Sequence, residues 1–380
     1  MTDKGIAFSG YREENAFITS EIIRDVLRVL SEDDLVNGRD VVRLEASLQE
    51  ACGRQHAVAV ASGTDAIFFA LAANGIGPGD EVLVPGFTFV ATASAILRTG
   101  ARPVFVDVSI DAEERGIAPC TMDLDDAEAR LSSRTRAIVW VGMYGGLSDP
   151  EAIAAFASRH DLVLIEDAAQ SFGASYDSIP AGRLGAASAL SFDRQKTLSA
   201  LGTAGAVVTD DATVAARIRA LRYHGKAGGG YAQLGFNSQL NSISAAVLLT
   251  KKCLFEQWAE RRRSIAAQYD AAFAGTSVHV LFWPKRSKHA RHKYVLLVRN
   301  RPAFQKFLAA NDVPTKVHYE RPLYREQVFA DGREAVPLLR TCDHLSDMVV
   351  SLPIHAFLTD PQVNRIIETV RCYDAAAPDV

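Results

Sequence analysis

A single lysine, Lys196, stands where a reactive amine would be useful. It lies in the stretch SFDRQKTLSALGTAG (191–205), which begins within the apolar run ALSF (189–192) and continues with small residues rather than acidic ones. Burial lowers the pKa of a lysine, and a neutral amine can attack a carbonyl carbon to form a Schiff base. A lysine taken singly is more often a solvated surface residue, so a catalytic role for Lys196 must be supported by other residues of the sequence.

Two further groups follow other strand-like runs. Asp167 ends LVLIED (162–167), and a carboxylate at such a position needs a cation, which a protonated ring nitrogen, a metal or a buried arginine would supply. Ser62, Gly63 and Thr64 follow AVAVA (57–61), where free N–H groups at a helix start favour a phosphate. Taken alone, Asp167 is equally well a loop cap, and Ser62 or Thr64 a helix cap.

The combination and its order favour one chemistry. A phosphate cradle, then a carboxylate, then a lysine are the three anchors of pyridoxal 5'-phosphate, which bind its phosphate, its pyridine nitrogen and its aldehyde. Phe89 in VPGFTFVAT follows another apolar run and offers an aromatic face for the ring, although a core phenylalanine fits the same pattern. The sequence therefore predicts a pyridoxal-phosphate site.

The elements that would position these residues alternate along the chain. Short apolar runs joined by helix-like segments indicate an α/β domain with a mostly parallel sheet and helices on both faces. The runs are 57–61, 81–85, 103–108, 137–141, 162–167, 189–192 and 206–211. Ligands gather at the carboxyl ends of such strands, which is where all the candidate residues lie.

The pattern changes near residue 255. Residues 241–275 read as one long helix or a broken pair, after which a strand (293–298), a helix (301–311), a strand (314–319) and a helix (360–374) indicate a smaller α+β domain. We expect a large domain over 1–254 and a small one over 255–380. The glycine-rich segment 224–237 is expected to be a mobile loop.

Composition excludes several classes of protein. Lys and Arg total 41 against 45 Asp and Glu, a net charge of -4, so nucleic acid is not an expected partner. No apolar run approaches the roughly 20 residues that cross a bilayer, and the N-terminal segment does not resemble a secretory signal, so we expect a cytoplasmic protein without membrane contact. The five scattered cysteines are typical of free thiols. The short HARH (289–292) and CDH (342–344) stretches lack partners at ligand spacing, so no metal is expected.

The sequence resembles the DegT/DnrJ/EryC1/StrS sugar aminotransferases, which have the aspartate-aminotransferase-like fold type I with a mostly parallel seven-stranded sheet. The resemblance extends over nearly the whole chain and includes VAVASGTDAIFFAL, GPGDEVLVPGFTFVATASA, IEDAAQSFGA, SFDRQKTLSALGTAG, GFNSQLNSISAAVL, VHYERPLYREQ and VVSLPIHAFLTD. It departs from the family pattern at Gly142 in VGMYGG, where a histidine is usual, at 202–205, where GxGG is common, and at Gln239, where an arginine is frequent.

The resemblance implies a role for each motif residue. Lys196 would form the Schiff base with the cofactor, Asp167 would pair with the pyridine nitrogen and Phe89 would stack on the ring. The other implied contacts are Gln170 near the ring hydroxyl, Gly63, Thr64 and Ser191 at the phosphate, Asn237 reaching the phosphate from the second subunit of a homodimer, and His318 and Tyr319 near the substrate.

The implied reaction moves an amino group, with L-glutamate as donor, onto a nucleotide-linked keto-deoxysugar, in ping-pong fashion through pyridoxamine 5'-phosphate. A cyclitol or another cyclic ketone is the alternative acceptor. Lys196 argues against the sugar dehydratases of the family, in which histidine replaces the lysine. A regulatory homologue without turnover is the remaining alternative, and a nicotinamide-dependent dehydrogenase is disfavoured because no GxGxxG follows the first strand.

Overall fold

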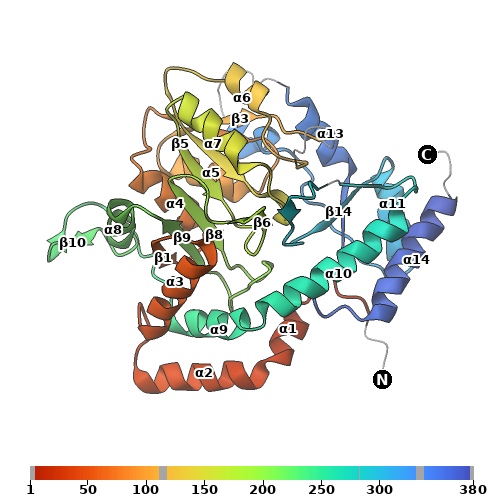
Figure 1. Cartoon of the computed structure of the whole chain (residues 1–380), viewed down its shortest axis with the longest axis horizontal. Helices are drawn as coiled ribbons and strands as arrows, with labels where there is room; N and C mark the ends of the chain where they lie inside the picture. Colours follow the sequence, from red (N-terminus) through yellow and green to blue (C-terminus); the bar gives the residue numbers. More distant parts are fainter. Residues whose placement is uncertain (1–4, 111–117, 282, 331–337, 377–380) are drawn as a thin grey trace.

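The computed structural model describes residues 5–110, 118–281, 283–330 and 338–376 (Figure 1). Its centre is a seven-stranded sheet, and every strand that the apolar runs predicted is present. The strands are β1 (His56–Val60), β2 (Glu81–Pro85), β3 (Arg102–Val106), β4 (Thr135–Val141), β5 (Val163–Asp167), β8 (Ala187–Ser191) and β9 (Gly205–Thr209), in the order β1-β9-β8-β5-β4-β2-β3. The α/β fold class is confirmed.

Helices cover both faces of this sheet because successive strand residues point to opposite sides. In β4, Ile138 and Trp140 join one buried apolar cluster, whereas Val139 and Val141 join the other. Helices α4 (Gly63–Ala73), α5 (Val90–Arg98) and α8 (Ala212–Leu221) pack on the face of Val139, and α3 (Arg39–Cys52), α7 (Pro150–Arg159) and α9 (Ser242–Lys252) on the face of Trp140. Side-chain caps start several of these helices, among them Ser62 for α4 and Asn241 for α9.

One strand, β9, is antiparallel to the other strands of the sheet and determines the path of the chain at their carboxyl edge. β9 pairs antiparallel with both β1 and β8, so that Gly205 lies opposite Val60 on one side and Ser191 on the other. The segment 192–204 therefore connects β8 to β9 as a hairpin over the carboxyl edge of the parallel strands. Lys196 lies on this hairpin.

The C-terminal part has its own three-stranded sheet, formed by β12 (His279–Val280), β14 (Tyr294–Leu297) and β15 (Val349–Leu352). It packs with α10 (Phe255–Phe273), α11 (Arg301–Ala310) and α14 (Asp360–Ala376) around a third apolar cluster. Of the two alternatives for 241–275, one long helix or a broken pair, the structure has the broken pair, since α9 ends at Lys252 and α10 begins at Phe255. We propose that the two domains meet at residues 254 and 255, although Ile6 from the N-terminal segment also packs in this third cluster.

The predicted strand over 314–319 is wrong. Within this segment only an isolated bridge forms, between Lys316 and Ser351. Ser351 belongs to β15, the edge strand of the small sheet, which the sequence analysis did not predict as a strand. The backbone of 314–319 instead turns toward the large domain, where His318 and Tyr319 reach the active edge.

The remaining elements are short or lie at the periphery. They are α1 (Tyr11–Phe17), α2 (Thr19–Glu32), α6 (Leu124–Ala129), α12 (Gln327–Ala330), α13 (Arg340–Met348), two 3-10 turns (Met143–Gly145 and Leu323–Arg325), and the strands β6 (Ser175–Tyr176), β7 (Ile179–Pro180), β10 (Lys226–Ala227), β11 (Gly230–Tyr231) and β13 (Ser287–Lys288). The β10-β11 hairpin lies inside the segment 224–237 that was expected to be a loop. No helix in the described ranges is both long and apolar enough to cross a bilayer.

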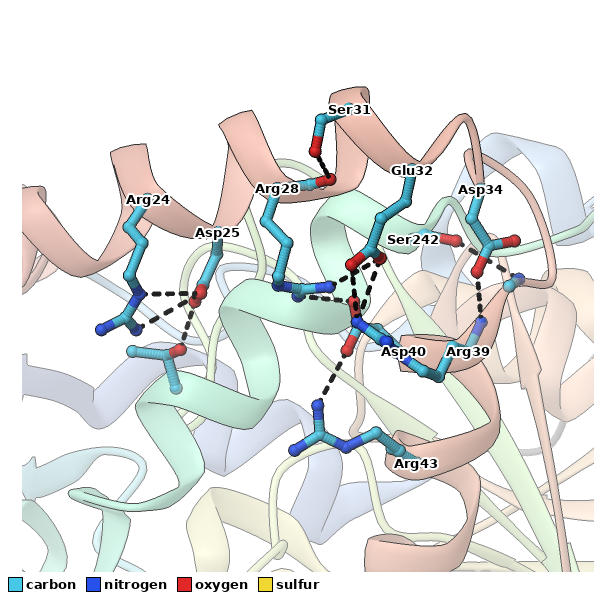
Figure 2. Close-up of polar contacts among 12 residues, drawn as sticks. Arg24, Asp25, Arg28, Ser31, Glu32, Asp34, Arg39, Asp40, Arg43 and Ser242 are labelled. Carbon is cyan, nitrogen blue, oxygen red and sulfur yellow. Dashed lines mark hydrogen bonds and ion pairs between the residues drawn. The ribbon is translucent and has the colours of Figure 1, made fainter.

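Helix α2 has an unusual orientation. Its charged side is turned toward the chain, where Arg28 bonds to Asp40 of α3 at 2.7 Å and Asp25 accepts a hydrogen bond from Thr250 of α9 (Figure 2). The apolar residues Ile23, Leu27 and Leu30, spaced at helical intervals on one face, are 54%, 62% and 54% exposed. Amphipathic surface helices normally bury the apolar side, whereas here Val29 is buried and these three apolar residues are left uncovered in the single chain.

A buried ion pair ties the N-terminal helix to the lysine hairpin. Lys251 of α9 lies 2.7 Å from Glu14 of α1, with side chains 0% and 5% exposed. Ser199 of the hairpin donates to Glu14 Oε1 at 2.9 Å and accepts from Lys251 Nζ at 3.0 Å. Tyr11 Oη adds a hydrogen bond to the carbonyl of Ala200 at 3.2 Å. Two distant segments, α1 and α9, thus fix the hairpin.

This triad predicts a large stability effect. Lys251→Met should lower the free energy of unfolding by about 3–5 kcal/mol, because it leaves the Glu14 carboxylate buried without a cation. Urea denaturation of the variant and the parent measures the difference. Lys288→Met is the matched control, since its 3.0 Å pair with Glu256 is exposed and should contribute less than about 1 kcal/mol. Equal losses in the two variants would contradict the role given to burial.

Candidate active site

A cavity of about 360 Å³ lies at the carboxyl edge of the central sheet, a size suited to a small ligand. All the candidate site residues except Asn237 line it, although they come from five separate segments of the chain. These are Gly63, Thr64, Phe89, Asp167, Gln170, Ser191, Lys196, His318 and Tyr319. The structure therefore brings together the residues that the sequence singled out.

Asp167 is a buried carboxylate at the end of β5. Its Oδ2 accepts a hydrogen bond from Thr92 Oγ1 at 2.8 Å, and its Oδ1 accepts from the N–H of Ala169 at 3.1 Å. Burial raises the pKa of Asp167, and the two hydrogen bonds and the charge of Lys196 only partly oppose that rise. No ion pair to Asp167 occurs among the described residues, so a cationic ligand group in the cavity would relieve this carboxylate.

Lys196 lines the same cavity from the β8-β9 hairpin. Its N–H donates to the carbonyl of Asp193 at 2.8 Å in a tight turn, and the residue is half-buried. Burial lowers the pKa of Lys196, while Asp167 and Asp193 act in the opposite direction. A lowered pKa favours the neutral amine, which is the form that attacks a carbonyl.

An anion cradle lies at the start of α4. Ser62 caps the helix through its Oγ, which accepts from the N–H of Asp65 at 3.1 Å. The N–H groups of Gly63 and Thr64 donate to nothing among the described residues, and they open on the cavity. A Cβ on Gly63 would lie 2.7 Å from Ser191 Oγ, so only glycine allows this hydroxyl to join the cradle. Free N–H groups and the helix dipole favour a phosphate here.

The ring side of the cavity is aromatic and polar. Phe89 is half-exposed and lies with its ring centroid 5.9 Å from that of Tyr319. Gln170 Nε2 donates to Tyr319 Oη at 3.4 Å. A planar ring between Phe89 and this polar wall would have a phosphate cradle at one end and the Asp167 carboxylate at another, so the residues present fit pyridoxal phosphate.

Tyr144 joins three walls of the cavity, a role that the sequence reading missed. Its N–H donates to Gln170 Oε1 at 3.1 Å, its carbonyl accepts from the N–H of Lys293 at 3.1 Å, and its hydroxyl donates to the carbonyl of His318. The residue is fully buried and has a φ of 57°, which is costly for a tyrosine. The three glycines around Tyr144 in VGMYGG were a sequence signal for a tight turn at this position.

Three other residues at the site were also missed. Thr92 orients Asp167, and His292 and Lys293 line the cavity opposite the sheet. Thr92 follows Phe89 by three residues, so its place in the first turn of α5 could have been predicted from the sequence. His292 and Lys293 come from the C-terminal domain, and only the domain packing places them here.

Asn237 lies apart from this cavity. It is exposed on the segment after β11, where it forms an isolated bridge with Tyr223. Nearby apolar residues are also uncovered, with Leu234 93% and Tyr231 75% exposed. A role for Asn237 at the site of its own chain is therefore not supported, and any such role needs a second chain.

The departures from the family pattern have local structural causes. A Cβ on Gly142 would approach Ser171 Oγ to 2.5 Å, so Ser171 fills the space that a larger residue would need. Gln239 accepts a hydrogen bond from Asn37, on the segment between α2 and α3. Neither residue lines the cavity.

The comparisons agree with this geometry. The model described as the DegT/DnrJ/EryC1/StrS aminotransferase family matches residues 16–371. A pleiotropic regulatory protein of Geobacillus stearothermophilus is 36% identical over 94% of this chain and 95% of its own length. The UDP-2-acetamido-2-deoxy-3-oxo-D-glucuronate aminotransferase of Pseudomonas aeruginosa is 35% identical over 95% of this chain and 98% of its own length.

A solved structure is also similar throughout. DesV of S. venezuelae, in complex with a ketimine intermediate, superposes with a TM-score of 0.92 and 32% identity, and the match covers 97% of this chain and 98% of that one. The similarity thus extends to both domains.

The environment of Lys196 predicts its reactivity in the cofactor-free protein. Competitive labelling with acetic anhydride, read by mass spectrometry, should give Lys196 a pKa below the value of about 10.4 for a free lysine side chain. Asp167→Asn should lower this pKa further, because it removes a negative charge that favours the ammonium form.

Asp210→Asn is the control for that experiment. Asp210 lies at the far end of β9 and pairs with Arg54 at 2.9 Å, so its loss should leave the labelling of Lys196 unchanged. A Lys196 that labels like the free side chain, or that responds equally to both variants, would contradict the electrostatic account.

Proposed function

The chain belongs to the DegT/DnrJ/EryC1/StrS aminotransferase family, and from this premise we propose that it transfers an amino group from L-glutamate to a keto sugar carried on a nucleotide. As a member it is a pyridoxal-phosphate-dependent enzyme. The observation that carries the proposal is the convergence of Lys196, Asp167 and the free N–H groups of Gly63 and Thr64 on one cavity. A regulatory protein without turnover would not need these three groups together.

Each residue has a separate task in this proposal. When bound, pyridoxal phosphate supplies an aldehyde that condenses with amines and a ring that accepts electron density. Lys196 would hold the aldehyde end, and its Nζ would carry the proton that leaves the donor Cα. Asp167, held by Thr92, would keep a proton on the ring nitrogen.

The other cavity residues orient the cofactor. Gly63, Thr64 and Ser191 would bind the phosphate, while Phe89 would cover one face of the ring. Gln170 accepts a hydrogen bond from the N–H of Tyr144, and its amide nitrogen, which donates to Tyr319 Oη in the structure, would turn to the ring hydroxyl. His318 and Tyr319 would meet the substrate, and burial lowers the pKa of His318 to about 3, so it does so as a neutral ring.

The names of relatives support the acceptor class. The Pseudomonas aeruginosa protein acts on a UDP-linked 3-oxo sugar, as its name states. We extend to this chain the class of nucleotide-linked keto sugars and keep the cyclitol ketones as the second candidate. We also propose a cytoplasmic location, in keeping with five cysteines that are all free thiols.

We further propose that the active protein is a homodimer. The apolar face of α2, made by Ile23, Leu27 and Leu30, is exposed while its charged side is satisfied within the chain (Figure 2). A second uncovered region surrounds Leu234 and Asn237. Exposed apolar surface of this kind is typical of subunit contacts, and a second subunit there would account for a role of Asn237 at the neighbouring cavity.

The reaction itself is tested by two half-reactions. The enzyme loaded with pyridoxal phosphate should lose its visible absorbance on addition of L-glutamate. Nucleotide-linked 3-keto or 4-keto sugars, added next, should restore it, whereas cyclitol ketones should not. Lys196→Ala should show neither change. Restoration by cyclitol ketones alone would contradict the sugar assignment, and a wild-type protein inert to every donor and acceptor would favour the regulatory alternative.

Shared sites are tested by mixing two defective variants. If Asn237 serves the neighbouring cavity, Lys196→Ala and Asn237→Ala are each impaired, but their mixed dimer holds one intact site. Co-expression in equal amounts should recover about a quarter of wild-type activity, the statistical share of intact sites in a twofold assembly. Activity equal to the mean of the two parent proteins would show that each chain completes its own site.

A further inference from the structure

Lys293 lies at the cavity in a fixed position. Its N–H donates to the carbonyl of Tyr144 at 3.1 Å, just before β14 begins at Tyr294. The side chain lines the cavity together with Lys196, His292 and His318. Lys293 therefore faces the reacting lysine from the C-terminal domain.

The ammonium group of Lys293 has no anionic partner. Among the described residues its Nζ makes no hydrogen bond or ion pair, and its closest recorded contact is the ring of Phe8, 5.9 Å from the ring centroid. Lys293 is half-buried, whereas the fully buried Lys251 is paired with Glu14. Lys293 therefore differs from Lys251 in having a cation that is available to a ligand.

The charges around Lys293 are mostly of the same sign. Lys196, Lys316 and Arg262 repel it, and Asp193 is the acid that attracts it. Burial and these cations lower the pKa of Lys293 to about 7. A bound anion would reverse this effect, because an opposite charge favours the ammonium form.

An anionic ligand group would pair with Lys293, and the other residues of the cavity limit which group this is. The phosphate of the cofactor would have its own donors at the start of α4. An anion at Lys293 would instead belong to the molecule that reacts beside Lys196. Close to its reacting carbon such a molecule can carry a carboxylate, on the amino donor or on a keto sugar with an acid group, whereas the diphosphate of a nucleotide-linked sugar is attached at the anomeric carbon.

We propose that Lys293 binds a substrate carboxylate and so determines which donors or keto sugars react. This inference rests on the proposed aminotransferase function and adds a specificity residue to it. The bond is a charge-assisted hydrogen bond in a buried site, where such bonds contribute most.

The test compares Lys293→Met, which removes the charge at similar length, with Lys293→Arg, which keeps it. All variants are first shown to bind pyridoxal phosphate with wild-type absorbance. The half-saturating concentration of L-glutamate in the first half-reaction should rise about tenfold or more in Lys293→Met. Glutarate, a dicarboxylate that cannot react, should bind correspondingly more weakly by calorimetry, and Lys293→Arg should recover most of both losses.

A second arm separates the two sources of the carboxylate. The aminated enzyme is offered a nucleotide-linked keto sugar with a carboxylate and its neutral counterpart. A loss confined to L-glutamate and glutarate assigns Lys293 to the donor, and a loss confined to the acidic sugar assigns it to the acceptor. Losses in both arms mean that the two carboxylates use the lysine in turn, as ping-pong turnover at one site allows.

Lys316→Met is the matched control, because Lys316 lies over the same Phe8 ring at 5.0 Å but does not line the cavity. It should change each value less than about twofold. Wild-type values in every arm for Lys293→Met, with the cofactor bound, would overturn the proposal. A wild-type enzyme that transfers no amino group would instead refute the proposed function, so the two failures are distinct.

Discussion

The burial of the Asp167 carboxylate without a cation is the constraint on which the site depends. Burying a carboxylate costs free energy. The Thr92 hydroxyl, the N–H of Ala169 and, further off, the amine of Lys196 partly offset this cost. The position is stable only because β5 is central and its neighbours hold it. In the proposed function, a ligand with a protonated ring nitrogen would supply the cation that this carboxylate needs.

Much of this could be predicted from the sequence because the signals are local. Buried parallel strands appear as continuous apolar runs, and residues that follow such runs meet at one edge of the sheet. Asp167 ends one such run, and Gly63 and Lys196 follow others within two and four residues. Their convergence required only that the runs be neighbours, which the order β1-β9-β8-β5 provides.

The residues that could not be predicted depend on contacts between distant segments. Lys293 reaches the cavity because the C-terminal domain packs on the Tyr144 turn, and Lys251 is buried because α1 brings Glu14 to it. Neither has a local pattern. The wrong strand prediction at 314–319 has the same origin, because contacts with distant segments place His318 and Tyr319 at the cavity.

The register of β5, β8 and β9 has one more consequence. Asp167 is aligned with Ala189, so Ser191 stands one strand sideways and two residues onward, which places the two α-carbons on the order of 8 Å apart. Backbone pairing sets this length, and Gly205 locks it from the next strand. The backbone pairing of the sheet therefore fixes the distance between the Asp167 carboxylate and the Ser191 hydroxyl. The surrounding loops remain free to diverge and to admit different molecules.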